Sequence, residues 1–128
     1  MTDEMGSFRV DVELENPSRP GERREGRSVL VDTGAELSWI PAPVLESLGI
    51  ARYRQARFRQ ATGTIVERSV GAAFIHVAGS STVDDVVFGE PTDLTILSSR
   101  TLEGLNFQID PVAKRLIDAG PMLAAHAA

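Results

Sequence analysis

The stretch Val29-Leu30-Val31-Asp32-Thr33-Gly34-Ala35 leads from three apolar residues directly into an aspartate on a small polar turn. Apolar and β-branched side chains predict a short strand, buried on both faces, over residues 28–31. Thr33 and Gly34 are typical of a tight turn. One carboxylate, that of Asp32, therefore lies where a buried strand ends. An aspartate in this position can cap a turn or helix, or it can be the acid of a cleft, and the tripeptide alone does not distinguish these alternatives.

Regular patterns flank this stretch on both sides. Residues 8–15 alternate apolar and charged residues, which predicts a strand with one buried face. Residues 18–26 are polar and contain Pro20 and Gly21, so we expect an exposed loop there. After the aspartate, residues 41–49 begin with prolines and end with glycine, which is typical of a short helix.

The rest of the chain is predicted to form further short strands and one more helix. Turn residues with glycine separate short apolar or alternating runs, as in successive β-hairpins. The expected elements are strands 56–60 and 64–70 around a tip at Ala61, Thr62 and Gly63, strands 73–78 and 82–88, strand 94–97, a helix over 100–105 capped by Ser98 or Ser99, and a closing hairpin of 107–111 and 115–118. Many short strands with two short helices predict an all-β fold, a closed antiparallel barrel or sandwich.

Length and composition are those of one globular domain. The chain has 128 residues, of which 42% are hydrophobic and 24% charged, enough for a single core. We assign residues 1–118 to this domain and expect residues 119–128 to be a flexible tail.

Charge and composition also exclude several classes of function. A net charge of −5 argues against nucleic acid as a partner. No apolar run approaches the roughly 20 residues of a membrane span, and the start of the chain, with Asp3 and Glu4, is unlike a secretory leader, so we expect a cytoplasmic protein without a membrane partner. With no cysteine and only two histidines, we expect neither a metal site nor another cofactor.

Taken with its surroundings, the Asp-Thr-Gly stretch resembles the active-site segment of the retropepsin-like aspartic proteases, especially their single-domain bacterial members. Residues 29–35 are similar to the family's apolar strand and active-site Asp-Thr-Gly-Ala, and residues 37–41 to the segment after it. The tip at residues 61–63 lies where the family has its flap. Ile96-Leu97-Ser98, followed by residues 101–105, lies where the family has an apolar pair, a glycine and a helix. With the closing hairpin, the resemblance covers about residues 8–117.

The resemblance implies a retropepsin-like acid-protease fold and an aspartic endopeptidase that hydrolyses peptide bonds of a peptide or protein substrate. It implies that Asp32 is the catalytic acid, that Thr33 braces the two turns of a dimer and that Gly34 lets the substrate backbone approach. The residues that it places against substrate are Ala35, Glu36, Ala61, Thr62, Gly63, Ile96 and Ser98.

Two positions depart from the family pattern. Ser98 stands where a glycine is usual, so its hydroxymethyl group is expected to crowd the active-site turn. Glu36 is longer than the aspartate common at its position in retroviral members. It is a candidate to pair with Arg100 or to contact the substrate backbone.

The chemistry of amide cleavage by paired carboxylates predicts a homodimer. This route requires two carboxylates that share one proton across a bound water. The chain contains a single Asp-Thr-Gly, and neither Asp84-Asp85, in an expected strand, nor Asp110, before a proline, repeats it. The second Asp32 must then come from another copy on a two-fold axis. Two alternatives remain: a peptide-binding or dimerisation module of the same fold, and an autoprocessing or single-target regulatory protease.

Two further side chains are interpreted as structural. His76 lies in an alternating segment, and its sequence neighbourhood does not suggest a serine or cysteine nucleophile, so a surface or half-buried role is expected. Trp39 follows the aspartate by a few residues and is expected to pack behind the turn, with a wall of the substrate pocket as the alternative.

Overall fold

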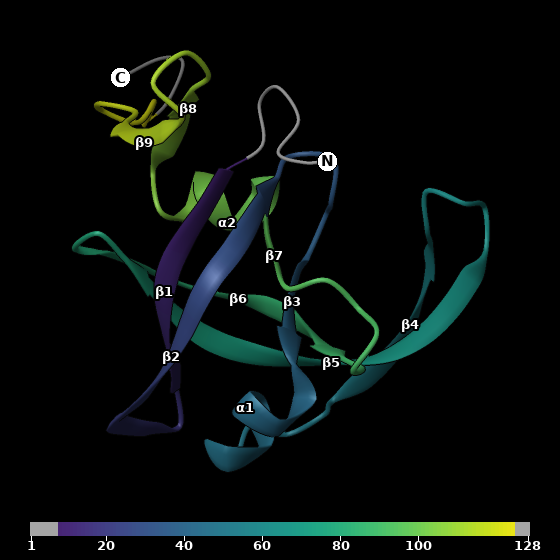
Figure 1. Ribbon diagram of the computed structural model, residues 1–128. Helices are drawn as coiled ribbons and strands as arrows, with labels where there is room; N and C mark the ends of the chain where they lie inside the picture. Colours follow the sequence, from purple (N-terminus) through teal and green to yellow (C-terminus); the bar gives the residue numbers. More distant parts are fainter. Residues whose placement is uncertain (1–7, 125–128) are drawn as a thin grey trace.

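Strands dominate the structure, a computed structural model that describes residues 8–124 (Figure 1). Its elements are β1 (Phe8–Asn16), β2 (Arg19–Asp32), β3 (Ser38–Pro41), α1 (Ala42–Ser47), β4 (Arg54–Arg59), β5 (Ile65–Val77), β6 (Ser80–Gly89), β7 (Ile96–Ser98), α2 (Ser99–Gly104), β8 (Phe107–Asp110) and β9 (Arg115–Asp118). The expected all-β class with two short helices is confirmed. The chain start with Asp3 and Glu4 and the last four residues of the expected tail lie outside the described residues.

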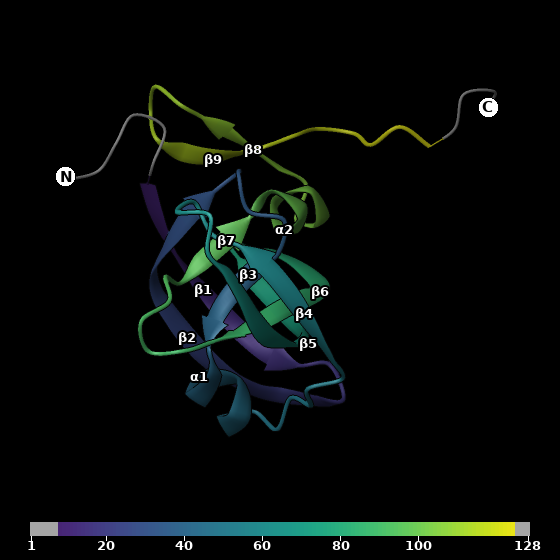
Figure 2. The same cartoon turned by 90° about the vertical axis from the view of Figure 1, so that its right-hand side faces the viewer.

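Within the described part of the chain, the larger sheet closes on itself. Its strand order is β1-β2-β7-β3-β6-β5-β4, and an additional pairing between β1 and β5 completes a ring from which β4 is left as an edge strand (Figures 1 and 2). The hairpin pairs are antiparallel as expected, but β2 pairs with β7 and β3 with β6 in parallel. Alternation reports which face of a strand is buried and not its direction, so these two pairings could not be predicted from it.

The inside of the ring is a continuous apolar core. Leu14, Val29, Ile75, Val86 and Leu97 come from five different strands, and each has no exposed surface. Full burial of such a side chain stabilises the fold by about 2 kcal/mol. The core holds the ends of β2 and β7 in place, and the Asp-Thr-Gly turn begins at one of these ends.

In the segment 18–26, expected to be a loop, residues 19–26 are instead the first part of β2. Only Pro17 and Ser18 form the turn, and Arg19 already begins the strand. Its charged side chains lie on the exposed surface, where Arg23 Nη1 pairs with Glu13 Oε1 at 3.0 Å on β1. The composition of this segment is as polar as that of a loop because this part of the hairpin is exposed to solvent on most of its surface.

The strands expected at 64–70 and 73–78 are one continuous strand, β5. Gly71 lies within this strand, and the position requires glycine because a Cβ there would stand 2.5 Å from the backbone oxygen of Ala51 and 2.9 Å from the ring of Phe88. The first half of β5 pairs with β4 and the second half with β6. The β4–β5 hairpin therefore extends from the ring as an arm (Figure 1).

The helices and the closing hairpin follow the sequence patterns closely. Leu45 of α1 is buried, and so is Leu48 directly after this helix. In the same way, Leu102 of α2 and Leu105 directly after it are buried. The expected cap is confirmed, since Ser98 Oγ accepts the Thr101 N–H at 3.2 Å. Strands β8 and β9 form a two-stranded sheet of their own. Neither described helix is long and apolar enough to cross a membrane.

Candidate active site

Asp32 is the last residue of β2, and the chain turns away from the ring directly after it. Its Oδ1 accepts the Gly34 N–H at 2.9 Å, and its carbonyl oxygen accepts the Ala35 N–H at 3.2 Å. Asp32 is half-buried, whereas Thr33 and Gly34 are exposed. Among residues 8–124, no hydrogen-bond donor is placed on Oδ2 of Asp32. The turn therefore fixes one carboxylate oxygen and leaves the other free to bind water or substrate.

The parallel pairing of β2 with β7 supports this turn from the side. It places Asp32 opposite Ser98 and Leu30 opposite Ile96, which is half-buried. The next residue, Ser99, donates both its backbone N–H (3.4 Å) and its hydroxyl (3.3 Å) to the carbonyl oxygen of Ala35. The start of α2 is therefore attached to the end of the Asp-Thr-Gly-Ala turn.

Ser98 belongs to a buried network of hydroxyl groups behind the turn. Its N–H donates to Ser38 Oγ at 2.9 Å, and its Oγ donates to Thr101 Oγ1 at 3.2 Å. Thr101 Oγ1 in turn donates to Asp84 Oδ2 at 2.9 Å. The hydroxymethyl group that was expected to crowd the turn is accommodated in this network. Sequence reasoning missed Ser38, Thr101 and Asp84 because they come from separate elements, and no periodicity relates them.

The suggested pairing of Glu36 with Arg100 is not found. Arg100 Nε lies 3.2 Å from Asp84 Oδ1, and Nη2 lies 4.0 Å from Asp85 Oδ2. Both aspartates lie on β6, which packs beside α2, so their carboxylates are the ones within reach of the guanidinium group. Glu36 remains exposed at the rim of the turn.

Ala61, Thr62 and Gly63 form the exposed tip of the β4–β5 arm. The Gln60 N–H donates to the Thr64 carbonyl oxygen and the Gly63 N–H to the Gln60 carbonyl oxygen, both at 2.8 Å, and Gly63 has a φ of +92° that favours glycine. In Figures 1 and 2 the tip rises to the level at which β2 ends.

The ring of Trp39 on β3 and the ring of Phe58, near the tip end of β4, meet edge to face with centroids 5.1 Å apart. This contact favours the packing role expected for Trp39. The structure thus gathers Asp32 to Glu36, Ile96 and Ser98 at one edge of the ring and carries the tip residues on a separate arm.

An open groove of about 1110 Å³ lies beside the turn. Thr33, Ser99 and Leu102 line one part of it, and β8 and the segment after β9 line another. In that segment Met122 and Leu123 are 71% and 79% exposed. Apolar side chains next to the Asp-Thr-Gly turn are thus left uncovered by residues 8–124.

Away from the turn, Arg68 and Asp93 form a structural ion pair. Arg68 forms two hydrogen bonds with Asp93, at 2.8 and 3.0 Å, and these bonds lower the pKa of the Asp93 carboxyl despite its burial. Across residues 8–124, no group of three or more histidine or acidic side chains is arranged to hold a metal ion.

A closed ring of strands, an aspartate turn at the end of a buried strand and a projecting hairpin arm together define the retropepsin-like fold. No protein-family model and no curated protein matches the sequence. Among solved structures, the chain is similar to the solution structure of the simian foamy virus (mac) protease, with a TM-score of 0.50 and 17% identity over 74% of this chain and 91% of that one. At this identity the likeness confirms the expected fold, and the bacterial subtype stays a prediction.

Proposed function

We propose that this protein is an aspartic endopeptidase that acts as a homodimer, with Asp32 of both chains at one shared site. The observation that carries the proposal is the Asp32 carboxylate itself. It stands at the end of a buried strand, on an exposed turn that fixes one of its oxygens through Gly34, within a retropepsin-like fold.

In the proposed reaction, the two carboxylates hold a water molecule between them. Two acids a few Å apart do not ionise together readily, so one keeps a proton while the other acts as a base, as is known for aspartic proteases. The base takes a proton from the water, and the protonated acid polarises the carbonyl of the scissile bond. The resulting tetrahedral diol collapses when the leaving nitrogen receives a proton. No covalent bond to the protein forms.

The second acid has to come from another copy of the chain. Asp84 is buried and already accepts hydrogen bonds from Thr101 and from the backbone of Asp85. Asp110 caps its own turn by accepting the N–H groups of Val112 and Ala113, both at 3.1 Å. A two-fold axis beside the turn brings two equivalent Asp32 side chains together. The uncovered apolar groove next to Thr33 supports a contact between copies there.

An extended peptide is the proposed substrate. β4 is an edge strand, and its free backbone groups are suited to pair with an added strand. The tip residues Ala61, Thr62 and Gly63 would close over the bound peptide as a flap, with Ala35, Glu36, Ile96 and Ser98 near its floor.

The test is to incubate a diverse peptide pool with the wild-type protein and with Asp32→Asn, and to identify new termini by mass spectrometry. Cleavage is expected to fall roughly 1000-fold or more in Asp32→Asn, because the amide cannot serve as base or acid. Asp118→Asn is the matched control, since this exposed carboxylate on β9 lies outside the site and cleavage should continue.

Equal patterns for wild type and Asp32→Asn would refute the endopeptidase. That result would favour the peptide-binding or dimerisation module of the same fold. Cleavage restricted to the chain itself or to one protein, and dependent on Asp32, would instead identify the autoprocessing or regulatory form.

A further inference from the structure

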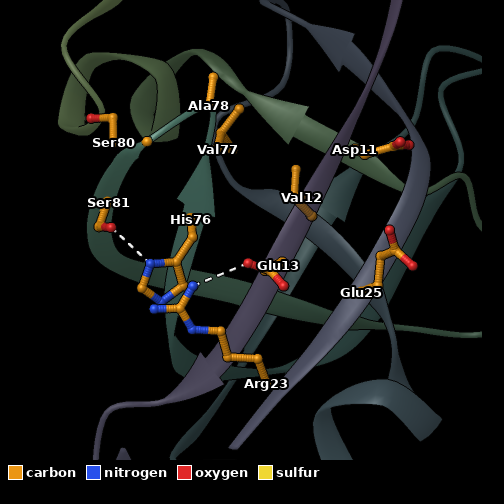
Figure 3. A pocket seen from close by; sticks show the side chains of 11 residues that line it. Asp11, Val12, Glu13, Arg23, Glu25, His76, Val77, Ala78, Ser80 and Ser81 are labelled. Atoms are coloured by element: carbon orange, nitrogen blue, oxygen red, sulfur yellow. Dashed lines mark hydrogen bonds and ion pairs between the residues drawn. The ribbon is translucent and has the colours of Figure 1, made fainter. Parts of the chain in front are cut away.

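A second cavity, of about 440 Å³, lies between the β1–β2 hairpin and the turn that joins β5 to β6 (Figure 3). None of the residues of the Asp-Thr-Gly turn lines it. The lining residues are Asp11, Val12, Glu13, Arg23, Glu25, His76, Val77, Ala78, Gly79, Ser80 and Ser81. The proposed peptidase does not use this cavity.

Three side chains from three strands form a continuous hydrogen-bonded chain at this cavity. Ser81 Oγ on β6 lies 2.7 Å from His76 Nδ1 on β5, and His76 Nε2 lies 2.7 Å from Glu15 Oε1 on β1. The register supports this alignment, since His76 is directly opposite Ser81. The imidazole also packs against the ring of Phe74, with centroids 4.3 Å apart. Packing and both hydrogen bonds therefore orient the imidazole.

The exposure of the three side chains decreases from the serine inward. Ser81 is exposed to solvent, whereas the side chains of His76 and Glu15 are only 11% and 6% exposed. A serine that reacts must be reachable, and an acid that only orients the histidine is best kept from water. The order of exposure fits nucleophile, base and orienting acid.

Glu15 is held in its charged form. The Gly21 N–H, which donates to Glu15 Oε2 at 2.6 Å, is the largest cause that lowers the pKa of this carboxyl, followed by the hydrogen bond from His76 and the charge of Arg23. A carboxylate only accepts hydrogen bonds, so the neutral His76 ring carries its hydrogen on Nε2. Its Nδ1 lone pair then faces the hydroxyl of Ser81.

We propose that Ser81 is a nucleophile for acyl transfer, with His76 as its general base and Glu15 as the positioning residue. The carboxylates of Asp11, Glu13 and Glu25 line the same cavity and would repel an anion. The substrate class is therefore a small carboxylic ester that is neutral or positively charged.

The reaction has two balanced halves. The Ser81 oxygen attacks the ester carbon while its proton passes to His76 Nδ1, and the guanidinium group of Arg23 in the cavity offsets the charge of the oxyanion. The bond to the leaving alkoxide breaks as His76 protonates it, which releases an alcohol and leaves an acyl group on Ser81. Water then attacks this acyl group and gives its proton to His76. That proton returns to Ser81 as the carboxylic acid departs.

The test uses a neutral fluorophosphonate, which forms a stable bond with an activated serine. We expect one adduct per chain by intact mass, mapped to Ser81, and formed at least roughly 100-fold faster than at Ser47, an exposed serine of α1 that donates to the backbone of Val44. Equal rates at the two serines, or no adduct, would overturn the proposal. Because both serines are compared in one molecule, this result does not depend on the folding of any variant.

Variants then separate the roles. Ser81→Ala should lose the adduct and the initial release of one equivalent of p-nitrophenol from p-nitrophenyl acetate, and His76→Gln should slow both by about 100-fold.

In Glu15→Gln the amide can donate to Nε2, so the ring ¹⁵N shifts of His76 should report a hydrogen moved to Nδ1, together with slower labelling. An unchanged tautomer and rate would refute the positioning role. Phosphonylation does not involve Asp32, so these results are independent of the peptidase proposal.

Discussion

Ser98 occupies the position where the resemblance to retropepsin-like proteases predicts a glycine, directly opposite Asp32 in the β2–β7 register. The side chain is fully buried and serves two purposes at once. It caps α2 through the Thr101 N–H, and it completes the hydroxyl network that reaches Asp84. Ser98 thus connects the strand pair that ends at Asp32 to a buried carboxylate on β6.

At this scale we expect Ser98→Ala to lower the free energy of unfolding by about 2 kcal/mol, because it removes a helix cap and a partner of Ser38 and Thr101. Urea denaturation measures the change. Ser47→Ala, which removes an exposed hydroxyl from α1, should cost much less. Equal midpoints for the two variants would contradict the role assigned to the network.

At the scale of elements, the loop between β6 and β7 is held against β5 by the Arg68–Asp93 pair. The side chains are 11% and 4% exposed, and Asp93 Oδ2 also accepts the Glu90 N–H at 2.7 Å. The hydrogen bonds from Arg68 are the largest cause that lowers the pKa of Asp93. This interaction matters for the site because the loop leads directly into β7 and Ser98.

A lowered pKa makes this contribution depend on pH. The stabilisation is complete above the ordinary pKa of an aspartate, 3.8, and is lost as the pH falls through the lower value in the folded protein. Asp93→Asn should therefore cost about 2 kcal/mol at both pH 7 and pH 5 and less at pH 3, as measured by urea unfolding at these three pH values. If the difference in unfolding free energy between wild type and Asp93→Asn stayed constant through this range, the role assigned to the ionised Asp93 would be refuted.

The control is the exposed pair of Arg27 and Glu25, 2.9 Å apart with side chains 78% and 50% exposed. Glu25→Gln should change stability little at any of these pH values, because water and salt screen such a pair.

At the scale of the whole molecule, each chain carries half of the proposed peptidase site. Activity per chain should therefore fall on dilution as dimers separate, and sedimentation at micromolar and nanomolar concentrations measures the separation. When wild type is mixed with an equal amount of Asp32→Asn, about a quarter of the dimers would carry two intact acids if the chains exchange freely.

Activity per wild-type chain in that mixture should then drop to about half, since half of the wild-type chains sit in mixed dimers. The control is to mix wild type with Asp118→Asn, which should leave the activity per wild-type chain unchanged. Activity that is independent of both dilution and mixing would show that a single chain is sufficient, contrary to the proposed dimer.

Much of the fold could be predicted because local patterns and local structure agree. The alternation of residues 8–15 and the prolines and glycine that frame 41–49 mark elements close to those observed. The predictions were wrong where contacts or exposure in the folded protein, and not the local pattern, determine the local structure. Residues 19–26 look like a loop because their strand is exposed, and Gly71 looks like a break although Ala51 and Phe88 require a residue without a side chain there.

Local patterns are sufficient to predict the strand-rich class and the Asp-Thr-Gly turn, because periodicity and turn chemistry act between residues a few positions apart. The parallel pairing of β2 with β7, the hydroxyl network that includes Ser98 and the contact of Glu15, His76 and Ser81 depend on how the whole chain folds. These contacts join strands distant in sequence, and closure of the sheet into a ring sets their neighbours and register, which no local pattern encodes.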